Sequence, residues 1–405
     1  MILAALVTVA ALAAAAPAAA ATSPTKSVMF VGNNWDGTAD VVDPRRRSGF
    51  RNLARINIIP DEQERMLEIA TNPDRLAFFL AIQQAVGEGN NQYVDDMYST
   101  KDGRLLIVSR PSFADVIGLE IKTGEIKWRF PVEGYRSDHM ALSPDGKHVA
   151  VSASTGNVVH ILDVNTGEEV GQFPSGDSPH ENIYSKNGKL IYHASIGRVY
   201  TPTDDPELDT TKGDVRFQIV RASDNEIILQ RDMGQKLEEA GYPDMSSAVR
   251  PMTLSPSEGK VFFQVSFFHG FVEYDFSEDR VTRVANLPNL VPEIPREQYL
   301  LDSAHHGITM NPEGTKLCVA GTMSDYAAIV SRKSFNHTLI QGGEKPYWST
   351  NNGTGHYCFV SWSGSDRISA ISYKTKKEVA RIAVGDHPQR MRMGKVRRSW
   401  LASLP

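Results

Sequence analysis

The chain has 405 residues and a formal net charge of −5, and 41% of its residues are hydrophobic. This length suits either two or three average domains or one closed ring of repeated β-sheet units. The basic residues are scattered along the chain and form no stripe with aromatic residues, which argues against a nucleic-acid partner. Two cysteines, Cys318 and Cys358, are too few for a disulfide scaffold or a cysteine-ligated zinc site.

The N-terminal residues 1–21 are almost all alanine, leucine, valine and isoleucine, and they end in alanines that fit a small-residue cleavage site. We therefore expect a signal peptide and a mature protein that is secreted, periplasmic or held at the cell surface. An uncleaved membrane anchor is the alternative, although alanine is only weakly apolar and Pro17 interrupts the run. No other segment is apolar enough to span a bilayer, so residues 22–405 are expected to form one domain without a membrane span.

Residues 61–90 combine charged and apolar side chains at the spacing of an amphipathic helix. Asn72 and Pro73 suit the cap and the first position of a helix. The sequence thus predicts a short helical insertion before the first complete repeat.

A turn motif at residues 143–147, Ser-Pro-Asp-Gly-Lys, recurs along the chain at intervals of about 42 residues, lengthened twice by insertions. Related sequences, aligned on their glycines, occupy residues 100–104, 185–189, 255–260, 311–315 and 351–355. Each unit contains four short β-forming runs separated by Asp-Gly, Gly-Asn and Asn-Thr-Gly turns, which is typical of a four-stranded antiparallel sheet. Such sheets bury their faces by stacking side by side around an axis.

Six complete units and one divided unit predict an all-β, seven-bladed β-propeller. The divided unit joins a C-terminal strand within residues 387–396 to N-terminal strands at residues 28–31 and 39–43, and this pairing removes the open sheet edge. The complete units begin near Tyr93, Ser137, Pro179, Val249, Ala304 and Lys345.

Residues 144–151 and 158–166 resemble the repeats of secreted bacterial YVTN-type propellers, and residues 382–388 resemble the junction between blades in that family. The resemblance covers nearly the whole mature chain and implies the same fold. The resemblance leaves the activity open, because proteins of this family resemble several functional classes: lactonases, lyases, β-chains of quinoprotein amine dehydrogenases and binding proteins.

Four insertions distinguish one rim of the predicted ring, the rim where the inner strands begin. They cover residues 61–90, 200–213, 234–247 and 287–302, and the opposite rim carries none of comparable size. Functional segments are commonly carried by loops above a rigid scaffold, so we expect a wall or lid around a site on this rim.

The inner strand of each predicted blade begins with polar residues that would converge on the ring axis. Several of these polar residues are histidines. Three of the histidines, together with a carboxylate, could bind a divalent metal ion, since imidazole and carboxylate suit zinc, copper, iron and nickel. The metal candidates are His139, His180, His306 and Asp96. A catalytic set without metal would comprise His180, Glu181, His306 and Arg250, the arginine holding an anionic substrate. The expected ligand-binding residues are Trp35, Tyr200, Phe268, Asp325, Tyr326, Trp348 and Arg390.

These features favour a propeller that binds a small ligand, anionic or metal-bearing, at the mouth of its channel. A lactonase-type or lyase-type enzyme that uses the same pocket is the second hypothesis, and a scaffold for a protein partner is the third. The two cysteines lie at neighbouring phases of adjacent blades, where either a disulfide or two buried thiols is expected.

Overall fold

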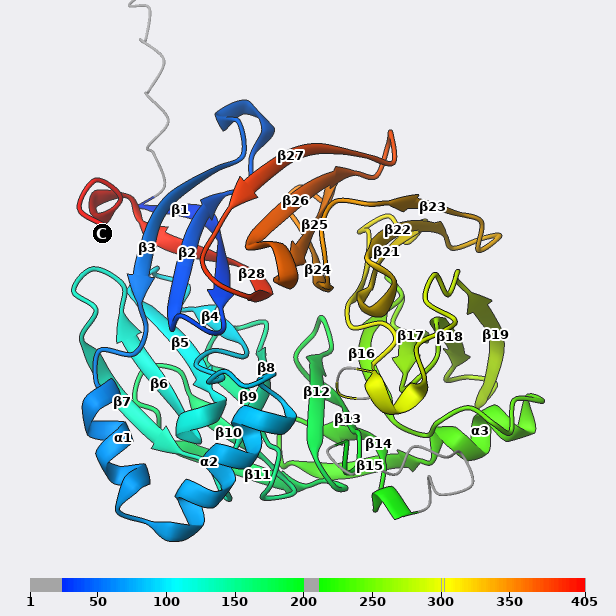
Figure 1. Ribbon diagram of the computed structural model, residues 1–405, viewed down its shortest axis with the longest axis horizontal. Coiled ribbons are helices and arrows are strands. Elements are labelled where there is room, and N and C mark those ends of the chain that lie inside the picture. The colour runs from blue at the N-terminus through cyan, green and yellow to red at the C-terminus, as the bar shows by residue number, and fades with distance from the viewer. Residues whose placement is uncertain (1–23, 200–210, 300, 302, 405) are drawn as a thin grey trace, which may run out of the picture.

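Seven four-stranded antiparallel sheets surround a central axis in the computed structural model, which describes residues 24–199, 211–299, 301 and 303–404 (Figure 1). This is the predicted seven-bladed β-propeller. The predicted signal peptide lies outside the described residues. Among the described residues, no helix is both long and apolar enough to cross a membrane.

Each blade is named here by its place around the ring. Blade one comprises β28 (Pro388–Arg397), β1 (Thr25–Asn33), β2 (Thr38–Asp43) and β3 (Arg51–Asn57), and blade two comprises β4 (Met97–Ser99), β5 (Leu105–Arg110), β6 (Asp115–Glu120) and β7 (Ile126–Pro131). Blade three comprises β8 (Ser137–Leu142), β9 (His148–Ala153), β10 (Val158–Asp163) and β11 (Glu169–Pro174), and blade four comprises β12 (Pro179–Tyr184), β13 (Leu190–Ser195), β14 (Phe217–Arg221) and β15 (Glu226–Arg231). Blade five comprises β16 (Val249–Leu254), β17 (Lys260–Val265), β18 (Gly270–Asp275) and β19 (Arg280–Asn286). Blade six comprises β20 (Ile308–Met310), β21 (Lys316–Gly321), β22 (Tyr326–Ser331) and β23 (His337–Ile340), and blade seven comprises β24 (Pro346–Asn351), β25 (Tyr357–Trp362), β26 (Arg367–Ser372) and β27 (Lys377–Ala383).

The repeated turn joins the first and second strands of a blade. In blade three, the Ser143 hydroxyl donates to Asp145 and accepts from the backbone N–H of His148, while Gly146 takes a left-handed conformation with φ of 73°. In blade five this left-handed position belongs to Glu258, with φ of 58°, and not to Gly259. The alignment on Gly259 was therefore wrong by one residue, because a glycine beside the turn was mistaken for the turn residue itself.

Two helices in the first insertion confirm the predicted helical segment: α1 (Glu62–Ala70) and α2 (Pro73–Ala85). The Asn72 side chain caps α2 by accepting from the N–H groups of Asp74 and Arg75, both at 3.1 Å. Buried Arg110 of blade two holds the start of α1 through Asp61 at 2.6 Å. In Figure 1 these helices lie against blades two and three. A further helix, α3 (Met233–Glu239), occupies part of the insertion before blade five.

Closure of the ring depends on β28, which pairs with β1 from Thr25↔Arg397 to Asn33↔Pro388. The two faces of β1 are both buried. Val28 and Phe30 pack in the core shared with blade two, and Met29 and Val31 pack in the core shared with blade seven. The C-terminal strand therefore joins two apolar cores as well as a sheet edge.

Deletion of residues 387–405 is expected to abolish cooperative unfolding, because it leaves the edge of β1 unpaired and opens the cores on both sides of blade one. Urea unfolding followed by circular dichroism measures this. Deletion of residues 402–405, which lie beyond β28, is the control and should retain a single transition. A single transition of unchanged midpoint in the longer deletion would contradict closure by β28.

Cys318 of β21 and Cys358 of β25 form a disulfide between blades six and seven, with Cα atoms 6.4 Å apart. Both residues are buried in an apolar cluster that includes Ile329, Val360 and Trp362. The structure thus selects the disulfide over the two free thiols that the sequence left open. The bridge links adjacent blades in the half of the ring opposite α1 and α2 (Figure 1).

The double variant Cys318→Ala/Cys358→Ala is expected to lose about 2–4 kcal/mol of unfolding free energy, since the bridge restricts the unfolded chain. Reductant should destabilise the parent protein by a similar amount and leave the double variant unaffected. Denaturant unfolding with and without reductant gives these values, and peptide mass spectrometry without reduction should find the linked pair. Recovery of two free thiols would contradict the bridge.

Candidate functional site

All seven inner strands, or the residues just before them, contribute to one cavity at the mouth of the channel. We call it the histidine cavity; its volume is about 20 Å³, enough for a single water molecule or ion. The inner strands contribute Asp95, Asp138, His139, His180, Arg250, His306, Tyr347 and Gln389. The insertions add Val86 and Leu301, and Val199 lies directly before the insertion at residues 200–213. The structure therefore brings the inner-strand residues together on the rim that carries the insertions, as the sequence predicted.

His139, His180 and His306 form the centre of this cavity. Each offers a ring nitrogen, and the three nitrogens lie within 4.8 Å of one another. The side chains come from blades three, four and six, and each residue is at most 4% exposed. Burial, with nearby positive charge, holds the pKa of all three imidazoles well below the usual value of histidine. The cluster is therefore neutral at physiological pH, the form in which imidazole binds metal ions.

Glu181, which directly follows His180 in β12, adjoins the three histidines. Its Oε2 lies 2.8 Å from Nδ1 of His139, and burial raises the pKa of this carboxyl to about 8. Nδ1 of His180 and Nδ1 of His306 are buried and have no hydrogen-bond partner among the described residues. Buried polar atoms are rarely left unpaired, and a water molecule, an ion or a ligand in the cavity would give these nitrogens a partner.

Two carboxylates, Asp95 and Asp138, form a second group with His139. Arg390 forms an ion pair with Asp95, and Arg136 forms one with Asp138. Burial raises the pKa of Asp95 well above its usual value, although Arg390 opposes the shift. Acidic and basic side chains are thus interleaved around the histidines.

Asp96, the carboxylate predicted as a metal ligand, does not belong to the histidine cluster. Arg392 donates to both of its oxygens, at 2.8 and 2.6 Å, and the backbone N–H groups of Met97 and Met140 donate to them as well. Its acceptor positions are therefore already used. Of the two consecutive aspartates it is Asp95 that lines the histidine cavity, whereas Asp96 is held by Arg392 outside it.

Trp348 forms the floor beneath the histidines, with its ring 5.9 Å from that of His139. The guanidinium groups of Arg390 and Arg392 lie 4.7 and 4.9 Å from the centre of this ring. A separate cavity of about 260 Å³, lined by Glu181, Trp348 and Arg392, lies below this floor, toward the opposite rim. These side chains separate the two cavities within the channel.

Four of the residues predicted to bind ligand have structural roles instead, and none lines the described part of the histidine cavity. The Trp35 ring stacks on His387 with centroids 3.8 Å apart, and Phe268 packs against the apolar cluster of blades four and five. Asp325 accepts from the backbone N–H of Lys345 at 2.7 Å, and the Tyr326 hydroxyl donates to the Pro288 carbonyl at 2.9 Å. Their place in loops on the predicted rim made these four residues candidates. Their side chains nevertheless pack within or between blades and do not reach the axis of the ring.

The remaining predicted residues lie at or near the cavity. Arg250 lines it, and its guanidinium donates to the Ser266 hydroxyl at 2.9 Å and to the Leu301 carbonyl. Trp348 and Arg390 do not line it but lie next to residues that do, Trp348 beside His139 and Arg390 in an ion pair with Asp95. Tyr200 lies outside the described residues.

Sequence reasoning missed Arg136 and Arg392. Arg392 follows Arg390 by two positions on β28, so the two-residue period of a strand would have placed both on one side. Arg136 directly precedes β8 and carries no comparable signal.

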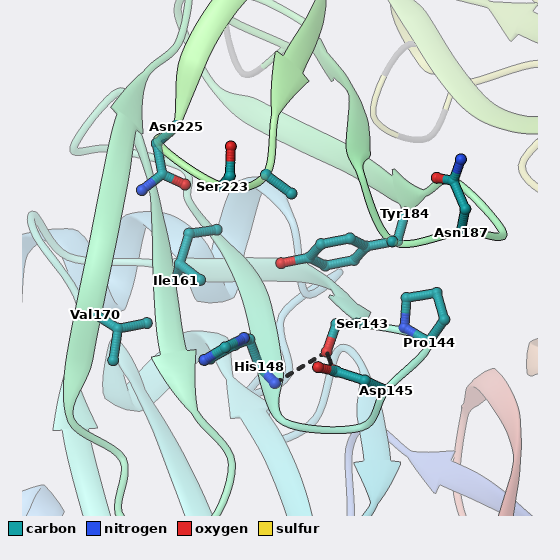
Figure 2. Close-up of a pocket in the computed structure, with 12 residues that line it drawn as sticks. Ser143, Pro144, Asp145, His148, Ile161, Val170, Tyr184, Asn187, Ser223 and Asn225 are labelled. Atoms are coloured by element: carbon teal, nitrogen blue, oxygen red, sulfur yellow. Dashed lines mark hydrogen bonds between the residues drawn. The ribbon is translucent and has the colours of Figure 1, made fainter.

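A different pocket lies between blades three and four on the opposite rim, with a volume of about 320 Å³ (Figure 2). It contains Ser143, Asp145 and His148, residue types that occur together in catalytic triads. The Ser143 hydroxyl, however, accepts from the backbone N–H of His148 and not from its ring. The same hydrogen bonds recur at Thr100 and Ser185, so this trio is the repeated turn.

Comparison with models of protein families gives no match, and comparison with curated protein sequences gives none. Among solved structures, the chain is similar to Kuenenia stuttgartiensis hydrazine synthase, with a TM-score of 0.55 and 14% sequence identity. The match covers 73% of this chain and 88% of the other. At this identity the likeness shows a shared propeller fold alone.

Behind the cluster, His193 of β13 orients the strand that carries His180 and Glu181. Its Nδ1 faces two acceptors, Oδ1 of Asn182 at 2.9 Å and the Glu181 carbonyl at 3.1 Å, and so carries the proton. Its Nε2 therefore accepts from the Ser175 hydroxyl at 2.7 Å. Burial lowers the pKa of His193 to about 3, and the ring remains neutral in the folded protein.

The free energy of unfolding is expected to fall as the pH falls from about 6.5 toward 3. In that window the unfolded chain protonates His193 while the folded chain does not, so unfolding takes up a proton and acid favours it. The contribution is about 1.4 kcal/mol per pH unit. His193→Gln should flatten the dependence by about that slope, measured by urea unfolding from neutral pH to about pH 5.

His337→Gln, in the exposed first residue of β23, is the matched control and should leave the slope nearly unchanged. An equal slope in the His193→Gln variant and the parent protein would contradict a neutral buried His193.

Proposed function

We propose that this protein is an exported propeller that binds a divalent transition-metal ion through His139, His180 and His306. The ion would present an open coordination position to a small ligand entering from the rim that carries the insertions. The observation that carries the proposal is the group of three buried, neutral imidazoles whose ring nitrogens lie within 4.8 Å of one another.

The donor set fits such an ion in several respects. Three histidines leave a fourth position open in tetrahedral zinc sites, and imidazole also suits copper, iron and nickel. The hydrogen bond between His139 and Glu181 is the kind that orients a metal-binding imidazole. The unpartnered nitrogens of His180 and His306 and the small cavity volume are further support.

Export is supported by two independent features. The N-terminal sequence has the composition of a signal peptide. Cys318 and Cys358 form a disulfide, and such bonds persist mainly in oxidising compartments. The resemblance of the repeats to YVTN-type propellers agrees with a bacterial secreted protein.

A lactonase-type or lyase-type enzyme is the second candidate function. The position of Asp95 and Asp138 beside His139 favours it, because a carboxylate next to a metal-bound water can accept a proton. Arg250 and Arg390 would attract an anionic substrate. A scaffold for a protein partner remains the third candidate and rests on the fold alone.

Protein reconstituted with zinc, copper, nickel or cobalt salts and then dialysed is expected to retain one tightly bound ion per chain. His139→Ala, His180→Ala and His306→Ala should each abolish stoichiometric binding, because each removes one of three ligands. Glu181→Gln should weaken binding by about 10-fold to 100-fold, as expected for a residue that orients a ligand. Elemental analysis of the dialysed protein and competition with a chelator give these values.

His148→Ala, which removes a histidine on the opposite rim, is the matched control and should retain the ion. Thermal unfolding checks that each variant folds. A folded parent protein that retains none of the four metals, or folded histidine variants that retain the ion as the parent does, would overturn the proposed site.

A further inference from the structure

A further cavity, which we call the α2 cavity, lies between α2 and blades three and four, on the rim that carries the insertions. Its volume is about 330 Å³, within the range of pockets for small molecules. Most of its wall is apolar, formed by Phe78, Ile82, Ala85 and Val86 on the helical side and by Ile196 and Val199 on the other side.

The α2 cavity adjoins the histidine cavity. Val86, Arg136, Ile196 and Val199 line both of them. A molecule in the apolar space would therefore have one end beside these shared residues, next to the histidine cluster. The two cavities differ in character, since the smaller is surrounded by charged and imidazole groups and the larger mainly by hydrocarbon.

Arg136 is the charged group at the boundary. Its Nη1 donates to the Asp138 carboxylate and, at 3.0 Å, to the Ser154 hydroxyl. Its Nε is buried and has no hydrogen-bond partner in the described part of the chain. Two other polar groups in the wall have partners, since the Ser154 hydroxyl donates to Asp138 and the Thr155 hydroxyl accepts from the backbone N–H of Tyr135. Gln84 and Ser178 complete the polar part of the wall. The residue with this unpartnered donor, Arg136, thus belongs to the part of the wall that the two cavities share.

We infer that the α2 cavity binds the apolar body of a small amphiphile whose single anionic oxygen group lies beside Arg136, at the boundary with the histidine cavity. The headgroup would lie between Arg136 and the open position of the metal ion, and in this respect the inference rests on the proposed metal site. An unbranched alkyl carboxylate is the simplest molecule of this class.

The dimensions and the distribution of charge support this occupant over others. A volume of about 330 Å³ with charge at one end only suits one apolar chain or ring system with one polar end. A peptide would bring backbone amide groups into the apolar space, where hydrocarbon offers them no partners. A larger polar ligand such as a sugar would meet the same penalty.

Butyrate, hexanoate, octanoate and decanoate, titrated calorimetrically into zinc-loaded and metal-free protein, test the inference. Affinity is expected to rise about fourfold for each methylene buried, up to the length that fills the cavity. Zinc should strengthen binding of all four acids by a common factor, because it acts on the headgroup that they share.

Ala85→Trp places a large side chain in the α2 cavity and is expected to weaken decanoate binding at least tenfold while changing butyrate binding little. Ala70→Trp, at the exposed end of α1 and outside the cavity, is the matched control and should bind all four acids as the parent does. Zinc content should be the same in the parent and both variants.

The outcomes separate the two proposals. Zinc retention with affinities that do not depend on chain length, or with a length dependence that survives in Ala85→Trp, overturns the amphiphile inference and leaves the metal site intact. A length dependence that is lost in Ala85→Trp, in a protein that retains no metal, supports the cavity and overturns the metal site.

Discussion

The pairing of β28 with β1 is the constraint on which the rest of the structure depends. Once the ring is closed, every inner strand begins at the same rim and at a similar distance from the axis. Residues from positions 95 to 389 therefore meet in one small cavity, although no two of the three histidines lie within 40 residues of each other. An open array of the same blades would hold each of these polar side chains at a separate edge.

Closure also buries charged side chains near the axis, and three arginines among them form ion pairs with carboxylates. Arg390 pairs with Asp95, Arg392 with Asp96, and Arg136 with Asp138. Breaking one partner of a buried ion pair is costly, since the other charge is left without compensation in a medium of low polarity. The three histidines differ because burial lowers their pKa and keeps them uncharged. His180 and His306 also each have a ring nitrogen without a partner among the described residues. Neutral donors within a balanced shell can accept a cation with little rearrangement of the surrounding ion pairs.

The sequence predicted the blades well because the turn chemistry and the two-residue period are local, and the length of the repeat is characteristic of propellers. It also predicted that His139, His180 and His306 meet, since equivalent phases in a closed ring determine that outcome. The sequence did not predict the direction in which a side chain points. Asp95 and Asp96 are neighbours in the chain, yet only Asp95 lines the histidine cavity. The sequence also did not place Trp35, Asp325 and Tyr326, which contact the neighbouring segments that join one blade to the next. The α2 cavity left no signal, because it is formed by a helix and loops from separate insertions and blades.

The floor of the channel gives the site a direction. Trp348, held between Arg390 and Arg392, separates the histidine cavity from the space below, and Glu181 lines that lower space while bonding to His139. A molecule that reaches the histidines must therefore come from the rim where α2 and the insertions lie. On that side the environment changes over a short distance from hydrocarbon to a group of charged and imidazole side chains. Such a boundary discriminates by the order of groups along a ligand, because reversing the molecule would put its charge among Ile82, Ala85 and Val86 and its apolar part among the arginines. The same scaffold that positions the three histidines would thus also fix the orientation in which the proposed ligand meets them.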